Sequence, residues 1–516
     1  MKRNRLFLLA AMLPALASMQ AQTSYEAAAL LDTDLSGTAR YVGMGGAMSA
    51  LGADMSTMGT NPAGTALYRS WDVAFSFSGN GVSQHTLSNS SRGRAFDPYA
   101  ALDNVGVVIA NKQSNIGILR FVNFGFNYRN VKRFDSRMGM ASNLENRWSQ
   151  TGQMAWQAFE NLDVRYEDFD HTDEDGFFGK NNYYKEAWVG WLTLMGAQGN
   201  LIDVSALDGG QFYPSYTNSY SEVLSGGIDA YDFNLSFNFA DAVYIGATLT
   251  RYNVDRRLES TYSENFADGN YTLQNFYLTT GSGFDFKLGV ILRPFAESSF
   301  RIGVSATTPT MYSLRDYNSA ILNSTVSLVP KEIDTYESYA FGGDCYTDYT
   351  LLTPTKVNFS MGGTIGTSLA LGAEYEYTDY STMMLYYNDG IENADMNNHT
   401  GGNFKQQHTL RLGAEKTFGS FYTRLGYNYQ TSGYKQDAWK MIPINSVQTN
   451  TAYANIESTT NYTCGIGFRG DVFYADVALL YSAQKASFYP FDDPSLPATS
   501  LSRNLTKGMM TVGVRF

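Results

Sequence analysis

Apolar and polar residues alternate along most of the chain, with the period of two that is typical of β-strands. Residues 231–239 are the clearest case, because phenylalanine and leucine occupy one face while aspartate, asparagine and serine occupy the other. The chain ends with the same alternation over residues 508–516. The pattern therefore predicts strands that each have one apolar face.

The predicted strands come in pairs separated by short turns, which is the spacing of β-hairpins. The first strand covers residues 72–79 and the last covers 508–516. Between them lie the hairpins 102–110 with 116–129, 231–239 with 243–252, 284–292 with 300–308, 356–365 with 369–380, 409–417 with 421–430, and 463–469 with 472–482. Short turns on one side and long connections on the other are typical of bacterial outer-membrane barrels. Because an open sheet edge would leave backbone groups unsatisfied in lipid, we predict an all-β fold, a closed 14-stranded antiparallel transmembrane β-barrel over residues 72–516.

Composition and charge exclude several other classes of protein. Charged residues make up 17% and aromatic residues 15% of the chain, a balance that disfavours disorder. The mean hydropathy of -0.26 is too low for a bundle of transmembrane helices. A net charge of -12 repels nucleic acid, so we expect no nucleic-acid partner.

The two ends of the chain indicate export to the cell outer membrane. Residues 1–21 begin with Lys2, Arg3 and Arg5 and continue with an apolar run, which predicts a secretory signal peptide. The aromatic C-terminal residue, Phe516, resembles the signal that outer-membrane barrels present to the barrel assembly machinery. Assembly machinery and outer-membrane lipid are therefore expected partners.

Glycine recurs on the polar face of the predicted strands, close to the short turns. These glycines are Gly106, Gly246, Gly289, Gly303, Gly362, Gly372, Gly413, Gly426 and Gly467. Glycine inside a strand often marks the close approach of another backbone, so we expect the lumen to be filled near the short turns. The alternative is that these glycines relieve the curvature of the barrel. Residues 22–71, rich in small residues, are the expected filler and form the predicted hatch.

The predicted hatch contains Gly43-Met44-Gly45-Gly46-Ala47, then Gly52-Ala53-Asp54, then Asn61-Pro62-Ala63-Gly64. In this order, ahead of the first strand, these motifs resemble the N-terminal hatch of the FadL/TodX family of outer-membrane proteins, which carry long-chain fatty acids and aromatic hydrocarbons. The resemblance implies a hatch-gated channel for passive uptake of hydrophobic small molecules. The gate residues that it implies are Gly45, Gly46, Asp54, Asn61, Pro62 and Ala63.

The chain departs from the family pattern in two places. Met55 stands where an aspartate is usual, and the predicted extracellular loop over residues 131–230, partly helical, is far longer than its counterpart. The family also has branches labelled haemin receptors and branches that act as shuttles in a protein secretion system. Two alternatives therefore stay open: a haemin-binding receptor, and a scaffold or shuttle barrel.

Cations on the lumen face and tryptophans in the long loop are the candidate ligand-binding groups. They are Lys287, Lys356, Arg411, Arg424, Trp188 and Trp191. Buried charges need partners, so a carboxylated ligand would require one cation that the acidic residues leave unpaired. The tryptophans could receive a hydrocarbon tail, or the predicted helices over residues 142–166 and 185–201 could simply pack on each other.

The third predicted strand is the candidate exit. In the FadL family a kink in the third strand opens a lateral path from lumen to membrane. Here Gly125 lies close to Asn123 in that strand, and glycine weakens a ladder. We expect backbone pairing to break at these residues; the alternative is a continuous strand whose glycine makes room for the hatch.

We expect neither an enzyme nor a cofactor. The sequence has no G-x-S-x-G motif and no mid-strand histidine beside an inward serine or aspartate, so no catalytic residues are assigned. The acidic residues 168–176 fail the calcium-loop pattern at His171 and Asn182. The histidines are dispersed, which argues against haem. Cys345 is expected in a loop and Cys464 facing lipid, so no disulfide is predicted.

Overall fold

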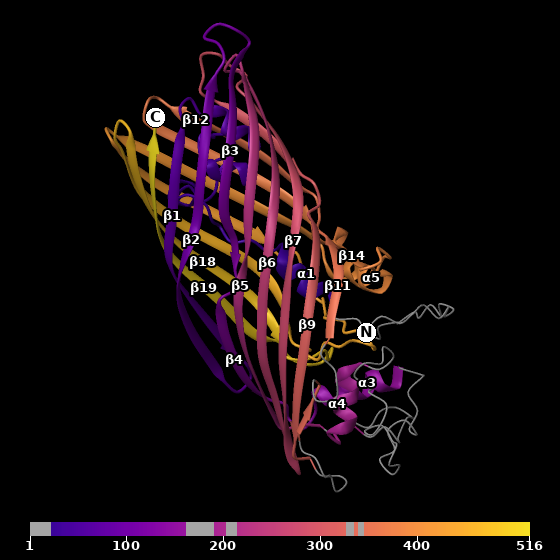
Figure 1. Ribbon diagram of the computed structural model, residues 1–516. Coiled ribbons are helices and arrows are strands. Elements are labelled where there is room, and N and C mark those ends of the chain that lie inside the picture. The colour runs from indigo at the N-terminus through magenta and orange to yellow at the C-terminus, as the bar shows by residue number, and fades with distance from the viewer. Residues whose placement is uncertain (1–21, 161–189, 203–213, 327–334, 339–344) are drawn as a thin grey trace.

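The computed structural model describes residues 22–160, 190–202, 214–326, 335–338 and 345–516. Its strands form one sheet that closes on itself, because β1 (Asp72–Leu87) pairs with both β2 (Arg92–Lys112) and β19 (Thr499–Arg515). Figure 1 shows the result as a tall barrel of tilted strands. The other strands are β3 (Leu119–Arg133), β4 (Ser136–Asn143), β5 (Thr217–Phe239), β6 (Val243–Phe266), β7 (Gly269–Leu292), β8 (Arg301–Thr307), β9 (Met311–Ser324), β10 (Thr335–Glu337), β11 (Cys345–Leu352), β12 (Lys356–Ile365), β13 (Leu369–Asp379), β14 (Met384–Tyr387), β15 (Gln406–Phe418), β16 (Phe421–Thr431), β17 (Tyr453–Arg469) and β18 (Phe473–Tyr489).

Several of these strands are parts of one crossing of the barrel wall. β3 and β4 both pair with β5, and β8 and β9 both pair with β7. β12 and β11 pair in turn with β8 and β9, and β13 and β14 pair with β12 and β11. Counted as crossings, the barrel has 14 antiparallel strands, so the predicted fold class is confirmed.

The outward face of the barrel is apolar next to the short turns. Exposed large side chains there include Phe75, Phe77, Leu249, Phe286, Leu412 and Leu479. An apolar face repeated around a closed sheet suits a lipid surrounding, as expected of an outer-membrane barrel. No helix in the described part of the chain is long and apolar enough to cross a membrane.

The segment before β1 lies inside the barrel. It contains α1 (Ser24–Leu31), α2 (Ala39–Gly43) and the 3-10 helices η1 (Met55–Gly59) and η2 (Pro62–Leu67), and nearly all of their residues are buried. α2 contacts β16 to β19, whereas η2 contacts β5, β6 and β7 on the opposite wall. Within the predicted hatch, residues 22–71, the segment 36–67 contacts opposite walls and keeps the name hatch, and α1 precedes it in the chain.

Two sequence-based expectations are wrong. Residues 131–230 are not all loop: β3 continues to Arg133, β4 follows, and β5 already begins at Thr217. The helices of this region are α3 (Gln150–Glu160) and α4 (Trp191–Gln198), both shorter than predicted.

Cys345 does not lie in a loop but begins β11, where it is buried, while Cys464 is exposed as expected, and both are free thiols. The strands were underestimated because they extend past the lipid-facing belt, where both faces carry polar residues and the alternation fades.

Candidate functional site

The hatch packs backbone against backbone on a row of wall glycines. Gly362 pairs with Gly372, Gly372 with Gly413, and Gly413 with Gly426, so four adjacent wall strands present glycine at one level. A Cβ atom on any of the last three would lie 2.1 to 2.4 Å from backbone atoms of residues 44–47. Only glycine leaves room for this contact, which supports close approach of the hatch, rather than relief of curvature, as the reason for this row.

The first hatch motif is held by its own backbone geometry. Gly45 and Gly46 have φ of 62° and 83°, a region that side-chain-bearing residues rarely adopt. The carboxylate of Asp54 caps η1 by accepting from the Ser56 amide at 3.0 Å, and it also accepts the Thr38 hydroxyl at 2.8 Å. These contacts fold the segment back on itself inside the lumen.

The third hatch motif, residues 61–64, packs on another pair of facing glycines. The Asn61 side chain caps η2 by accepting from the Ala63 amide at 3.1 Å, and Pro62 occupies the first turn of that helix. Gly246 and Gly289 face each other on β6 and β7, and a Cβ atom on either would overlap with Asn61 or Pro62. All six predicted gate residues therefore lie in the hatch.

Buried ion pairs tie the hatch to the wall. Arg40 of α2 donates to both carboxylate oxygens of Glu415 at 3.0 and 3.1 Å. Arg424, which is fully buried, donates to Glu415 at 2.6 Å and to Asp476 at 2.7 Å. Breaking such a pair leaves an uncompensated buried charge. Arg424, a predicted ligand-binding residue, is thus paired within the wall and shares Glu415 with Arg40 of the hatch.

Helix α1 lies across the lumen and is fastened to the long connections. The Ser24 hydroxyl and His399 Nδ1 lie 2.9 Å apart, where His399 belongs to α5 (Ala394–Asn403) beside β14 (Figure 1). Lys440 donates to Glu26 at 2.8 Å. Burial lowers the pKa of His399 to about 4, so this imidazole is neutral near pH 7.

The end of α1 is fastened to β3. Lys132 pairs with Asp32 and lies 3.8 Å from a carboxylate oxygen of Asp34. Burial by itself would raise the pKa of Asp34, but Lys132, Arg503 and the Arg133 amide outweigh it, and the pKa is lowered. Asp34 is therefore a carboxylate at neutral pH.

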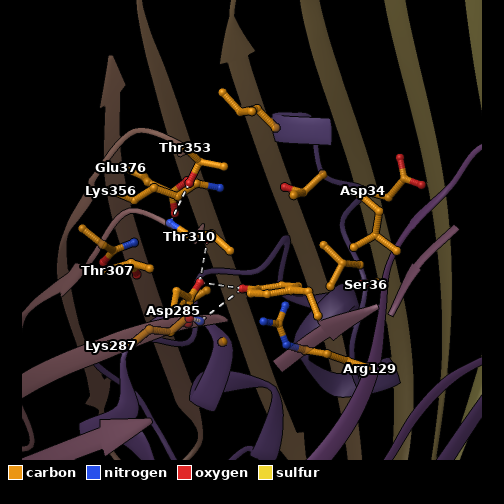
Figure 2. Close-up of a pocket in the computed structure, with 18 of the residues that line it drawn as sticks. Asp34, Ser36, Arg129, Asp285, Lys287, Thr307, Thr310, Thr353, Lys356 and Glu376 are labelled. Carbon is orange, nitrogen blue, oxygen red and sulfur yellow. Dashed lines mark hydrogen bonds and ion pairs between the residues drawn. The ribbon is translucent and has the colours of Figure 1, made fainter. Parts of the chain in front are cut away.

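An inner cavity of about 120 Å³ lies between α1, the hatch and the wall. Figure 2 shows Asp34, Ser36 and Arg129 on one side of it, and Lys356 and Glu376 on the other. The leucines at the end of α1 also line this cavity. It is a mixed polar and apolar chamber.

Of the cations that line the inner cavity, Lys356 is the one whose side chain forms no ion pair or hydrogen bond with a described residue, although Glu376 of the same cavity attracts it. Lys287 is paired with Asp285, Arg411 donates to Glu374 at 2.8 Å and to Glu376, and Arg129 is paired with Asp232 at 2.7 Å; Lys356 has neither a hydrogen bond nor an ion pair. Sequence reasoning selected Lys287, Lys356 and Arg411 together, but their pairing distinguishes them.

An outer cavity of about 200 Å³ lies on the other side of α1. Tyr25, Glu26 and Ala29 of α1 line it, with apolar side chains from β5, β6, β18 and β19. Because α1 lines both cavities, it separates them. Arg256 of β6 also lines the outer cavity, and sequence reasoning missed it because the predicted strand stopped at residue 252.

Two neighbouring wall strands are broken beside the inner cavity, although backbone hydrogen bonds still cross the breaks, such as that from the Thr308 amide to the Phe286 carbonyl at 2.9 Å. β8 and β9 are separated by Thr308-Pro309-Thr310, and β11 and β12 by Thr353-Pro354-Thr355. The two breaks face each other: the Thr353 amide donates to the Thr310 carbonyl at 3.0 Å, and the Thr310 amide donates to the Thr353 hydroxyl. Proline cannot donate a hydrogen bond to a β-ladder. The two Thr-Pro-Thr segments were therefore a signal in the sequence from which these strand breaks could have been predicted.

The expected break at Gly125 is wrong. The β2–β3 and β3–β5 ladders run without interruption from Asn123 to residue 127. A Cβ atom on Gly125 would lie 2.2 Å from Met58 Cε, so this glycine makes room for the hatch. Asn123 donates to the carbonyl groups of Thr65 and Tyr68, and therefore fastens the hatch rather than opening the wall.

Of the two candidate tryptophans, the structure describes only Trp191. Trp191 is buried among apolar residues such as Met154 and Leu194, and lines neither cavity. Trp188 and the acidic residues 168–176 lie outside the described residues. Contact between α3 and α4 agrees with the alternative that the helices of this region pack on each other.

Several similar solved structures are outer-membrane channels or transporters. They include a Pseudomonas aeruginosa FadL homologue (11% identity, 94% of this chain and 98% of the other, TM-score 0.48), the Ralstonia pickettii toluene transporter TbuX (12%, 94% and 99%, 0.49) and the Pseudomonas putida toluene transporter TodX (9%, 94% and 99%, 0.48). No family model and no curated protein matches the sequence. The resemblance to the FadL/TodX family is thus confirmed at the level of the fold.

Proposed function

We propose that this barrel is an outer-membrane channel for passive uptake of hydrophobic small molecules. The observation that carries the proposal is the pair of cavities in series, separated by α1, in a lumen whose short-turn end is filled by the hatch. A solute from the long-connection side, taken as the outside of the cell, enters the outer cavity first. It reaches the inner cavity when α1 shifts.

We infer that the solute leaves sideways, through the broken wall strands. Thr308, Thr310, Thr353 and Pro354 all line the inner cavity, and Thr308 is also exposed on the surface. The hatch route is less favourable, because Arg40 and its buried partners would have to separate. This exit takes the place of the one expected near Gly125.

Uptake by cells tests the proposal. Cells that produce the full-length chain in their outer membrane should accumulate radiolabelled toluene, the named cargo of two similar proteins, or oleate, faster than cells that lack it. The proposal would be overturned if cells with and without the protein accumulated each probe at the same rate. Native mass spectrometry of the purified protein separates the alternatives: bound haemin would indicate a haemin receptor, and a bound protein would indicate a shuttle barrel.

A further inference from the structure

Arg256 is a buried cation that forms no ion pair with a described residue, although the carboxylates of Glu222 and Asp316 lie near enough to attract it. Its residue is 7% exposed, and its Nε and Nη1 atoms are buried without a hydrogen bond. In the described part of the chain it forms no ion pair, and its guanidinium lies 5.7 Å from the ring centre of Phe134 and 5.8 Å from that of Tyr277. Arginine is almost never buried unless paired, so a direct ion-pair partner is missing.

The other cations around the outer cavity do not share this feature. Lys132 pairs with Asp32, Arg133 with Asp135 at 3.0 Å, Lys440 with Glu26, and Arg503 lies 3.9 Å from Asp34. Glu222 lines the same cavity, but it accepts the Tyr220 hydroxyl at 2.8 Å and does not pair with Arg256. Among the described residues, the cavity therefore presents one buried cation that forms no ion pair.

We propose that the cargo is a compact carboxylate with one ring-sized apolar body, and that Arg256 binds its carboxylate. A planar guanidinium is suited to bidentate binding of a carboxylate. Leu224, Leu258 and Phe488 provide an apolar wall for the ring. A cavity of about 150 Å³ holds benzene, so about 200 Å³ accommodates one ring.

This inference rests on the proposed function and names its substrate class. Lys356 in the inner cavity provides a second binding site. The carboxylate leaves Arg256, passes α1 and binds Lys356 beside the broken wall strands. An anion would then find a cation on each side of α1. A neutral hydrocarbon would have no need of either.

Calorimetric binding to the full-length protein in detergent tests the inference with benzoate and its neutral analogue benzamide. Benzoate should bind more tightly than benzamide. Arg256→Gln should weaken the affinity for benzoate at least tenfold, which corresponds to the loss of one charge-assisted hydrogen bond. The affinity for benzamide should change less than twofold. The matched control is Arg257→Gln, because Arg257 is the next residue and is exposed on the opposite face of β6. It should change neither affinity.

A second variant guards against misfolding of the first. Glu222→Gln removes an anion from the same cavity, so it should strengthen benzoate binding and leave benzamide unchanged. The inference is overturned if benzoate binds no better than benzamide, or if Arg256→Gln and Arg257→Gln act alike. Uptake of toluene without binding of benzoate would overturn this inference alone, whereas loss of all uptake and binding would overturn the proposed function.

Discussion

Gly426 of the wall and Gly45 of the hatch meet backbone to backbone. A Cβ atom on Gly426 would stand 2.1 Å from the amide nitrogen of Gly45, closer than any real Cβ contact. Two of the three nearest atoms, from Gly45 and Met44, are backbone atoms, which cannot swing away as a side chain can. The fit of the hatch in the lumen thus depends on the absence of a single methyl group.

Gly426→Ala should therefore loosen the hatch, at a cost of about 1 to 3 kcal/mol for overpacking, without preventing barrel assembly. The expected result is ion conductance in planar bilayers above that of the original protein, approaching that of a chain lacking residues 22–60. Gly79→Ala is the matched control, because a Cβ atom on Gly79 would meet nothing within 4 Å. Equal conductance of the two variants would show that the contact does not hold the hatch.

Gly125→Ala should be tolerated better than Gly426→Ala. Its new methyl group meets the flexible end of Met58 rather than backbone. Thermal melting should show a small loss of stability that Met58→Ala in the same chain removes. If Gly125→Ala lost hydrophobe uptake while its hatch stayed intact, the result would indicate that the solute leaves the lumen at β3.

Acid should release α1. The pKa of His399 is about 4 in the docked state, against an ordinary value near 6.5, because burial disfavours the imidazolium. The undocked state therefore binds more protons, so docking is unaffected above pH 7 and weakens as the pH falls from 6.5 towards 4, by up to about 3 kcal/mol. Hydrogen exchange of the α1 amides, corrected for intrinsic rates, should reveal lower protection over this range.

His399→Gln should remove this pH dependence, because glutamine does not titrate. His408→Gln, which replaces a half-buried histidine of β15, should leave it unchanged. Protection of α1 that stays constant from pH 7 to pH 4 in the original chain would contradict the assignment.

A cross-link should close the proposed exit. Thr310 and Thr353 exchange hydrogen bonds across the broken wall strands, a spacing that suits a disulfide. In a chain with Cys345 and Cys464 replaced by serine, Thr310→Cys with Thr353→Cys should abolish uptake when oxidised and restore it on reduction. The control pair is Val304→Cys with Phe359→Cys, which face each other in the unbroken part of the same wall strands. Undiminished uptake after complete cross-linking would mean that the solute leaves through the hatch.

The sequence alone determined the barrel, because a strand in lipid must alternate and a turn of two or three residues sets its register. It also pointed to the hatch, since glycines such as Gly413 on a polar face are explained by a backbone packed against them. Only the tertiary structure decided which cations are free. Lys287 and Lys356 look equivalent in sequence, but Asp285 neutralises the first and no described residue pairs with the second. Arg411 and Arg424 find their carboxylate partners on other strands, and the pattern along one strand does not contain such pairs.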